Sequence, residues 1–323
     1  MAERSGDALI FGRFQMDVPT NPSELHSGQT AEASRENRVC RLSDGRLLGY
    51  ADYGAADGRP VIALHGTPGS RLMFQLADWP ARERGLRLVA PERPGYALSS
   101  EQPRRALTDC PGDVAELADQ LGIDRFAVAG VSGGGAYAAA CAAMLGSRIS
   151  ATALVSPVGP FGHADLLSRL TMAERHLFVT IARSPWRSRL LFGSLRWFQN
   201  NAPGLAVAAI ISRSGAADKA ILRRPEIAAN LIEALSEGLR PGLSGAMQDL
   251  RLYSMPWNLF LKQMKAPCAI WHGRADHIVP FAAAEVLARQ IQSCELVQLP
   301  GVGHYWVYDH FDDVLDWLAK HGR

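Results

Sequence analysis

Short runs of apolar residues recur along most of the chain, and stretches with helical periodicity separate them. The runs are apolar at nearly every position, as expected of strands in a parallel sheet that helices cover on both faces. They lie at residues 61–64, 86–90, 126–129, 151–155, 268–271 and 296–299. The pattern therefore predicts an α/β fold built on a doubly wound, mostly parallel sheet.

The opening strands are predicted to be antiparallel, because segments 39–42 and 47–50 flank the turn-forming sequence Ser43-Asp44-Gly45. Helices are predicted where apolar residues repeat on one face. One begins at a capping Thr108 and has a face formed by Val114, Leu117 and Leu121. The last has a face formed by Phe311, Val314, Leu315 and Leu318.

The alternation of strands and helices stops between residues 159 and 267, where only helical patterns continue. This predicts a helical cap, 159–267, inserted into a core formed by 38–158 and 268–323. Residues 1–37 are rich in Ser, Gly, Asn, Pro and charged residues, which predicts a loosely ordered N-terminal arm.

Composition and charge narrow the class of partner. The 323 residues are 47% hydrophobic, enough for a large core, and 34 basic residues nearly balance 32 acidic ones. A net charge of +2 indicates no extended basic surface for binding nucleic acid, so no such partner is expected. The N-terminus lacks the apolar segment of a secretory signal, and glycines in the uncharged stretch 126–147 would break a membrane-spanning helix. We expect a cytoplasmic protein with no membrane partner.

The cysteines give no sign of a metal site or a disulfide framework. Five of them are scattered along the chain: Cys40, Cys110, Cys141, Cys268 and Cys294. No C-x-x-C pair and no cluster of metal ligands surrounds any of them. We expect reduced, buried thiols and neither a metal nor a cofactor.

The sequence Gly130-Val131-Ser132-Gly133-Gly134 joins a predicted strand to a predicted helix. A serine on so sharp a turn is strained, so its neighbours must be small, and its hydroxyl then projects from the sheet. Such a turn can also be merely structural or can bind phosphate. Its placement after a strand favours the interpretation of Ser132 as a nucleophile.

The sequence His65-Gly66-Thr67-Pro68-Gly69 follows another predicted strand, which places it at the same edge of the sheet as Ser132. The backbone N–H groups of Thr67 and Gly133 are the expected oxyanion-hole donors, since one donor normally belongs to the residue after the nucleophile. His65 itself is interpreted as a structural residue.

A serine hydroxyl needs a base, and the base needs a carboxylate that orients it. Asp276 and His304 follow the last two predicted strands, in the chain order serine, acid, histidine. His304 stands in the glycine-flanked loop Gly301-Val302-Gly303-His304 and is therefore the predicted base, with Asp276 as its partner. The rival histidines rank below it: His272, His277 and His310.

These segments resemble the α/β-hydrolase superfamily, in its serine-nucleophile branch with a helical cap. The similar stretches are HGTPG at 65–69, GVSGG at 130–134, GRADHIVP at 273–280 and GVGH at 301–304. The likeness covers residues 38–323 apart from the cap. The family also has a glycine where this chain has Ala97, a departure expected to affect loop packing. Dehalogenases and epoxide hydrolases share HGTPG but use an aspartate where Ser132 stands.

The resemblance and the residues together predict an esterase that forms an acyl-enzyme on Ser132 and acts on a small molecule. The same residues also suit a carbon–carbon bond hydrolase, a perhydrolase or an aminopeptidase. An aminopeptidase would need cap carboxylates to hold the substrate amine, for which the following are available: Asp165, Glu174, Glu226 and Glu233. A ligand receptor without turnover is the hypothesis from another class.

Segment 177–198 combines large apolar side chains with interleaved arginines: Arg183, Arg187, Arg189 and Arg196. Three interpretations are open. The segment is a lid that favours an apolar portion of the substrate, it packs the cap onto the core, or it is a basic amphipathic surface helix that touches lipid.

Overall fold

The computed structural model describes residues 35–322. The predicted N-terminal arm therefore lies outside the described residues except for 35–37. The division of the chain into a core and a separate cap domain stays a prediction.

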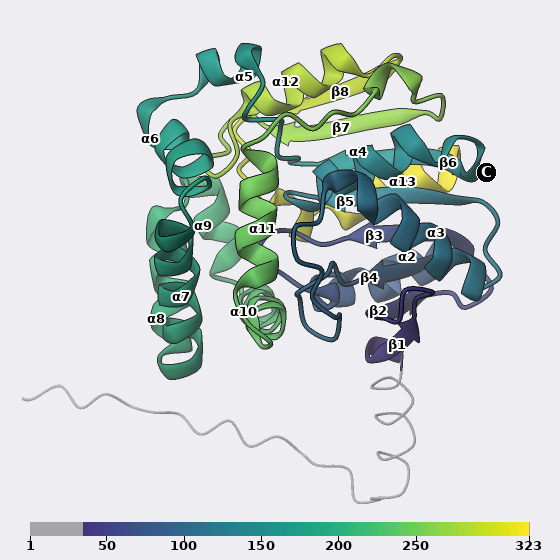
Figure 1. The fold of residues 1–323 in the computed structure, drawn as a ribbon, viewed down its shortest axis with the longest axis horizontal. Coiled ribbons are helices and arrows are strands. Elements are labelled where there is room, and N and C mark those ends of the chain that lie inside the picture. The colour runs from purple at the N-terminus through teal and green to yellow at the C-terminus, as the bar shows by residue number, and fades with distance from the viewer. Residues whose placement is uncertain (1–34, 323) are drawn as a thin grey trace, which may run out of the picture. The chain divides into compact units, whose positions relative to one another are not determined.

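An eight-stranded sheet forms the centre of the described chain (Figure 1). The strands follow one another in space in the order β1-β2-β4-β3-β5-β6-β7-β8. They are β1 Arg38–Arg41, β2 Leu47–Gly54, β3 Arg59–Leu64, β4 Leu86–Pro91, β5 Phe126–Val131, β6 Ile149–Val155, β7 Cys268–Gly273 and β8 Cys294–Leu299. β1 and β2 run antiparallel to their neighbours, and the other pairs are parallel. The predicted mostly parallel α/β sheet is confirmed.

The central strands are apolar at successive positions because they face a core on both sides. In β3, Ile62 and Leu64 point into one hydrophobic cluster, while Val61 and Ala63 point into the other. Burying such residues from both sides contributes roughly 25 cal/mol for each Å² of apolar surface removed from water. The two clusters therefore hold the helices against the two faces of the sheet.

The helices of the sheet layers are α2 Asp78–Glu83, α3 Cys110–Gln120, α4 Gly134–Met144, α12 Phe281–Gln290 and α13 Phe311–His321. Helices α3, α4 and α12 contribute to one cluster, and α2 and α13 contribute to the other. The four residues predicted to form the apolar face of the last helix are all buried. The predicted cap of α3 is wrong: Thr108 lies inside a 3₁₀ turn, Leu107–Asp109, and Asp109 occupies the N-cap position.

Between β6 and β7 the chain forms a series of helices that gather beside the sheet, at the left of Figure 1. They are α5 Ala164–Arg169, α6 Met172–Arg175, a π-helical turn His176–Ile181, α7 Pro185–Asn201, α8 Pro203–Arg213, α9 Ala216–Leu222, α10 Pro225–Leu239 and α11 Ser244–Tyr253. Further 3₁₀ turns lie at Arg71–Ala77, Gly146–Arg148, Leu261–Gln263 and Tyr305–Tyr308.

Two further features of the described residues are the state of the cysteines and the length of the helices. All five cysteines are free, but Cys40 and Cys294 are only half-buried, which corrects the expectation that every thiol is buried. Within residues 35–322, no helix combines the length and the apolar character needed to cross a bilayer.

Candidate active site

Ser132 lies on the sharp turn between β5 and α4. Its φ angle is 53°, in the left-handed region that a serine rarely adopts. The turn requires glycine on both sides: a Cβ on Gly130 would come within 2.4 Å of the Gly134 carbonyl oxygen, and one on Gly134 within 2.0 Å of the Leu64 oxygen. The hydroxyl thus stands at the carboxyl edge of the central strands.

The loops after β7 and β8 bring the predicted acid and base to this serine. The His304 Nε2 atom lies 3.1 Å from the Ser132 Oγ atom. On the other side of the ring, His304 Nδ1 lies 2.7 Å from the Asp276 Oδ2 atom. The three residues therefore form a continuous hydrogen-bonded chain, although 172 positions separate Ser132 from His304 and 28 separate Asp276 from His304.

The Asp276 side chain is buried and is held by the backbone of its own loop. Its Oδ1 atom accepts hydrogen bonds from the N–H groups of Ile278 at 2.8 Å and Val279 at 2.9 Å. Burial alone would raise the pKa of this carboxyl, but the neighbouring His304 and His272 outweigh burial and lower the pKa below its ordinary value. Asp276 is therefore a carboxylate at neutral pH.

His304 is 7% exposed, at the bottom of the site. Burial favours its neutral form, but the carboxylate of Asp276 stabilises the imidazolium more and raises the pKa of His304 above its ordinary value. Asp218 contributes to the same increase. The arrangement lets His304 take a proton from Ser132 and keep the resulting positive charge beside a carboxylate.

The loop 65–69 runs beside the serine. A Cβ placed on Gly66 would lie 4.0 Å from the Ser132 Oγ atom, and the Thr67–Pro68 peptide bond is cis. Within residues 35–322, no acceptor takes a hydrogen bond from the N–H of Thr67 or from that of Gly133. Neither predicted oxyanion-hole donor is therefore engaged by the described chain, and Thr67 lines the cavity next to Ser132.

A buried carboxylate from α11 fixes this loop, and no sequence pattern indicated it. The Asp249 Oδ2 atom accepts a hydrogen bond from Thr67 Oγ1 at 2.8 Å. The same Oδ2 atom accepts from Arg93 and Tyr96, and the Oδ1 atom accepts from Arg105 and Tyr137. Burial would raise the pKa of Asp249, but Arg93 and Arg105 lower it instead. The Thr67 side chain is thereby locked onto the helical insertion.

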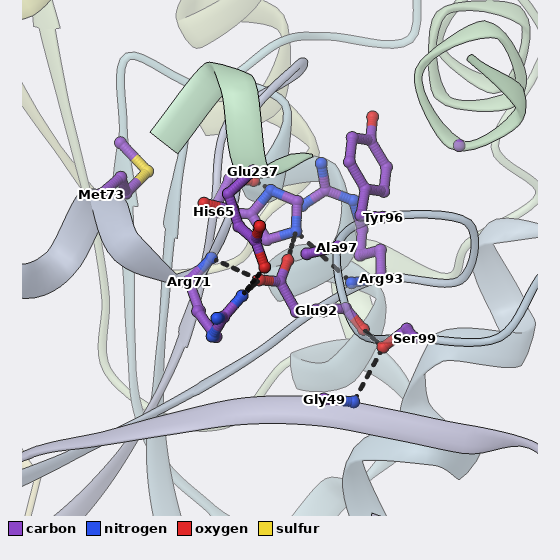
Figure 2. Close-up of polar contacts among 12 residues, drawn as sticks. Gly49, His65, Arg71, Met73, Glu92, Arg93, Tyr96, Ala97, Ser99 and Glu237 are labelled. Atoms are coloured by element: carbon purple, nitrogen blue, oxygen red, sulfur yellow. Dashed lines mark hydrogen bonds and ion pairs between the residues drawn. The ribbon is translucent and has the colours of Figure 1, made fainter. Parts of the chain in front are cut away.

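His65, the first residue of this loop, is completely buried, and its ring contacts a buried glutamate (Figure 2). Its Nδ1–H donates to the Gly66 carbonyl oxygen at 2.8 Å, so its Nε2 atom is an acceptor and receives the N–H of Arg93 at 3.4 Å. The Glu92 Oε2 atom lies 3.3 Å from the same Nε2. Two acceptors facing one another need a proton between them.

That proton belongs to Glu92. Complete burial raises the pKa of Glu92 to about 7, even though Arg71 donates a hydrogen bond to its Oε1 atom at 2.8 Å and opposes the increase. Burial and the nearby Arg93 guanidinium lower the pKa of His65. Near pH 7 and below, a protonated Glu92 can therefore donate to a neutral His65. Figure 2 shows Arg71 joining Glu92 to Glu237 of α10.

Asp218 is a second residue that sequence reasoning missed. It lies on α9, is completely buried, and accepts hydrogen bonds from the backbone N–H groups of His304 at 3.0 Å and Tyr305 at 2.8 Å. A Cβ on Gly303 would lie 2.3 Å from the Asp218 carboxylate, which explains the glycine before the histidine. The helical insertion thus positions the backbone that carries His304.

A cavity of about 220 Å³ opens onto Ser132 and His304. Its walls are mostly apolar, and part of them comes from the helical insertion: Leu195 of α7, Ile210 of α8, and Leu231, Ala234 and Leu235 of α10. The loop residues Thr67 and Pro68 also line it. The site can therefore hold an apolar group next to the serine hydroxyl.

Within residues 35–322, no hydrogen bond joins a rival histidine to Ser132, although the Nε2 atom of His272 lies 3.3 Å from the Asp276 Oδ2 atom. His310 pairs with Asp313 on the surface, and the side chain of His272 is bound to the Val279 carbonyl oxygen. His277 is exposed. None of the four carboxylates considered for holding a substrate amine lines the cavity: Asp165, Glu174, Glu226 and Glu233. Within residues 35–322, no group of three or more potential ligands could hold a metal ion.

Comparisons with known proteins identify the family of the chain. Residues 61–317 match a family model described as "Alpha/beta hydrolase family". The chain is 26% identical over 281 residues to the AB hydrolase superfamily protein YisY of Bacillus subtilis, a match that covers 81% of this chain and 91% of that protein. It is 25% identical over 275 residues to a non-heme haloperoxidase of Rhodococcus erythropolis, covering 81% and 90% respectively.

Among solved structures, an esterase from Exiguobacterium antarcticum is similar, with a TM-score of 0.67 and 20% sequence identity. The likeness covers 88% of this chain and 98% of the esterase. At this identity it concerns the fold alone.

Proposed function

Because the chain belongs to the alpha/beta hydrolase family, we propose that it is a serine esterase that cleaves carboxylic esters with an apolar acyl or alkyl group. The proposal rests on one observation above all: the hydrogen-bonded chain from Ser132 through His304 to Asp276, with distances of 3.1 and 2.7 Å, at the floor of a mostly apolar cavity. In this proposal Ser132 is the nucleophile, His304 is the base, and Asp276 is the carboxylate that orients the base.

In the first half of the proposed reaction, Ser132 Oγ attacks the ester carbonyl carbon while His304 Nε2 takes the hydroxyl proton. The carbonyl oxygen becomes negative and is stabilised by the N–H groups of Thr67 and Gly133. The C–O bond to the leaving group then breaks. His304 returns its proton to the departing alkoxide, so an alcohol leaves and the acyl group stays on Ser132.

In the second half, a water molecule attacks the acyl carbon and gives its proton to His304. The bond to Ser132 Oγ breaks, the proton returns to Oγ, and a carboxylic acid leaves. Asp276 stays ionised throughout, since its lowered pKa keeps it unprotonated while it stabilises the imidazolium.

The proposal is tested with p-nitrophenyl esters of increasing acyl length. The wild-type protein should hydrolyse them, and Ser132→Ala should reduce the rate to background. The matched control is Ser147→Ala, because Ser147 is an exposed serine outside the cavity. A rate for Ser132→Ala equal to that of the control would refute the role of Ser132. A folded wild-type protein that binds but never turns over these esters would favour the ligand-receptor hypothesis.

A second candidate is perhydrolysis, favoured by the similarity to a protein of Acinetobacter calcoaceticus that is named a bifunctional esterase/perhydrolase, 23% identical over 275 residues. Here hydrogen peroxide replaces water in the second half and carries the acyl group away as a peracid. Peracid formation from acetate ester and peroxide, measured beside ester hydrolysis, separates the two. The aminopeptidase hypothesis has lost its support, since the carboxylates it requires stand away from the cavity. No residue of the cavity favours carbon–carbon bond cleavage.

A further inference from the structure

Helix α7 of the insertion exposes an apolar stripe on its outer side. Trp186 is 65% exposed, Leu190 64% and Trp197 57%. These residues are 4 and 11 positions apart, spacings close to whole numbers of helical turns, so they lie on one side of the helix. The opposite side of α7 is already used: Phe192 is buried and Leu195 lines the cavity. The outer stripe is therefore apolar surface that the fold of this chain leaves uncovered.

Other exposed apolar side chains extend this surface. Helix α8 packs against α7, the two lying side by side in Figure 1, and carries Leu205 with 63% exposure. Phe198 is exposed near the end of α7 and contacts the Trp197 ring. Isolated apolar side chains on a surface are ordinary, whereas a contiguous set on one helix marks a surface that binds something.

The charge around the stripe is of one sign. Residues 175–217 contain six arginines and no lysine, aspartate or glutamate: Arg175, Arg183, Arg187, Arg189, Arg196 and Arg213. In the rest of the chain, 32 acidic residues outnumber the remaining 28 basic ones. Within residues 35–322, no carboxylate forms an ion pair with any of the six. The positive charge is therefore concentrated on α7 and its neighbours and is not neutralised.

The arginines flank the apolar stripe. At 100° per residue, Arg189 and Arg196 fall to one side of the line through Trp186 and Trp197, and Arg187 falls to the other. The Arg187 guanidinium lies 5.1 Å from the centre of the Trp186 ring. A helix whose outer face places tryptophan and leucine between arginines matches the chemistry of an anionic lipid surface, apolar at its boundary and negative at its headgroups.

We propose that the outer face of α7 docks on the surface of an anionic lipid bilayer. Trp186, Leu190 and Trp197 enter the boundary between headgroups and acyl chains, and Arg187 and Arg189 face the lipid phosphates. Arg196 donates a hydrogen bond to the Arg240 carbonyl oxygen at 3.1 Å and adds positive charge beside the stripe. The helix lies on the membrane and does not span it, in line with the finding on helix length. Leu195 on the inner side lines the cavity, so docking places the cavity wall next to a reservoir of apolar molecules. The docking itself does not depend on the proposed esterase activity.

The test is co-sedimentation of the full chain with vesicles of phosphatidylglycerol and phosphatidylcholine, compared with pure phosphatidylcholine, at low and at high salt. Binding is expected only to the anionic vesicles and should weaken as salt increases. The double variant Arg187→Gln/Arg189→Gln should bind about 25-fold more weakly, since each arginine near the surface contributes about fivefold. Trp186→Ser/Trp197→Ser should also lose binding.

Two control variants carry matched changes elsewhere on the surface. Trp79→Ser removes a tryptophan that is also 65% exposed, but on α2. Lys262→Gln/Lys265→Gln removes two exposed positive charges outside the insertion helices. Both controls should bind like the wild type, and every variant should keep the wild-type rate on a soluble ester and the wild-type melting temperature.

Failure to sediment with anionic vesicles at low salt would overturn the proposal. Equal weakening by the control variants would overturn it as well, because binding would then reflect overall charge or apolar content. Concentration-dependent dimers that the α7 variants abolish, in the absence of vesicle binding, would assign the surface to a second copy of the chain instead.

Discussion

Replacing Glu92 by glutamine should remove a pH dependence of stability that the buried carboxyl imposes. The glutamine side chain has the shape of the protonated acid: its oxygen can accept from Arg71, and its N–H can donate to the Nε2 atom of His65, beside the long contact from the Arg93 N–H. The variant therefore keeps the hydrogen bonds of the protonated cluster but cannot ionise. We expect Glu92→Gln to fold, because it reproduces the form that Glu92 adopts below pH 7.

The magnitude follows from the two pKa values of Glu92. Its pKa rises from 4.5 to about 7 on folding, so the folded protein binds the proton more tightly than the unfolded chain does. Glu92 therefore contributes stability that is fully present below its unfolded pKa and is lost as pH rises through 7. Between pH 5 and pH 8 the loss amounts to about 2 to 3 kcal/mol, and the glutamine variant should not show it.

The assay is urea unfolding of both proteins at half-unit steps from pH 5 to pH 8, from which the difference in free energy of unfolding is plotted against pH. Titrating groups remote from Glu92 contribute equally to both proteins and cancel in the difference. Glu226→Gln is the control: the pKa of Glu226 is lowered, so the stability that its carboxylate contributes is lost only as pH falls below this range. Its difference from the wild type should therefore stay nearly constant across the assay. A similarly constant difference for Glu92→Gln would refute the claim that Glu92 carries a proton near pH 7 and donates it to a hydrogen bond with His65.

Three further predictions concern the proposed base. Asp276→Asn should lower kcat by about 10⁴ while the fold survives, because the imidazole loses its orienting carboxylate; a loss below tenfold in steady-state hydrolysis would contradict the assignment. The rate should rise with pH through the raised pKa of His304, since only the neutral imidazole accepts a proton, and a flat profile would exclude this base. Asp218→Asn should lower kcat and move this rise to lower pH, because a nearby negative charge is lost; a merely structural role would leave the profile in place.

Much of the fold was predictable because the sheet is covered on both faces. Each predicted strand of the parallel sheet exists, since runs such as 126–129 have no polar position that could face water. The helix start near Thr108 was wrong because a 3₁₀ turn precedes α3, and the apolar periodicity does not distinguish the two kinds of turn. Ala97 adopts a φ of 43°, which explains why a glycine is usual there.

Ser132, Asp276 and His304 could be predicted from the sequence because strand ends and glycine-rich turns identify one edge of the sheet. Asp218 and Asp249 could not be predicted, because each lies on a helix far from its partners in sequence. An isolated aspartate in a helical pattern is typical of exposed positions, and only the packing of the insertion places these two carboxylates against the loops. Similarly, the apolar pattern of 177–198 does not reveal that Phe192 is buried while Trp186 is exposed.

The central claim is that Ser132 is a nucleophile activated by His304. Reaction of the protein with a fluorophosphonate, followed by mass spectrometry of its peptides, tests this directly. We expect one adduct per chain, on Ser132, with no labelling of Ser132→Ala and much slower labelling of His304→Ala. A folded wild-type protein that stays unlabelled, or an adduct on another residue, would contradict the account.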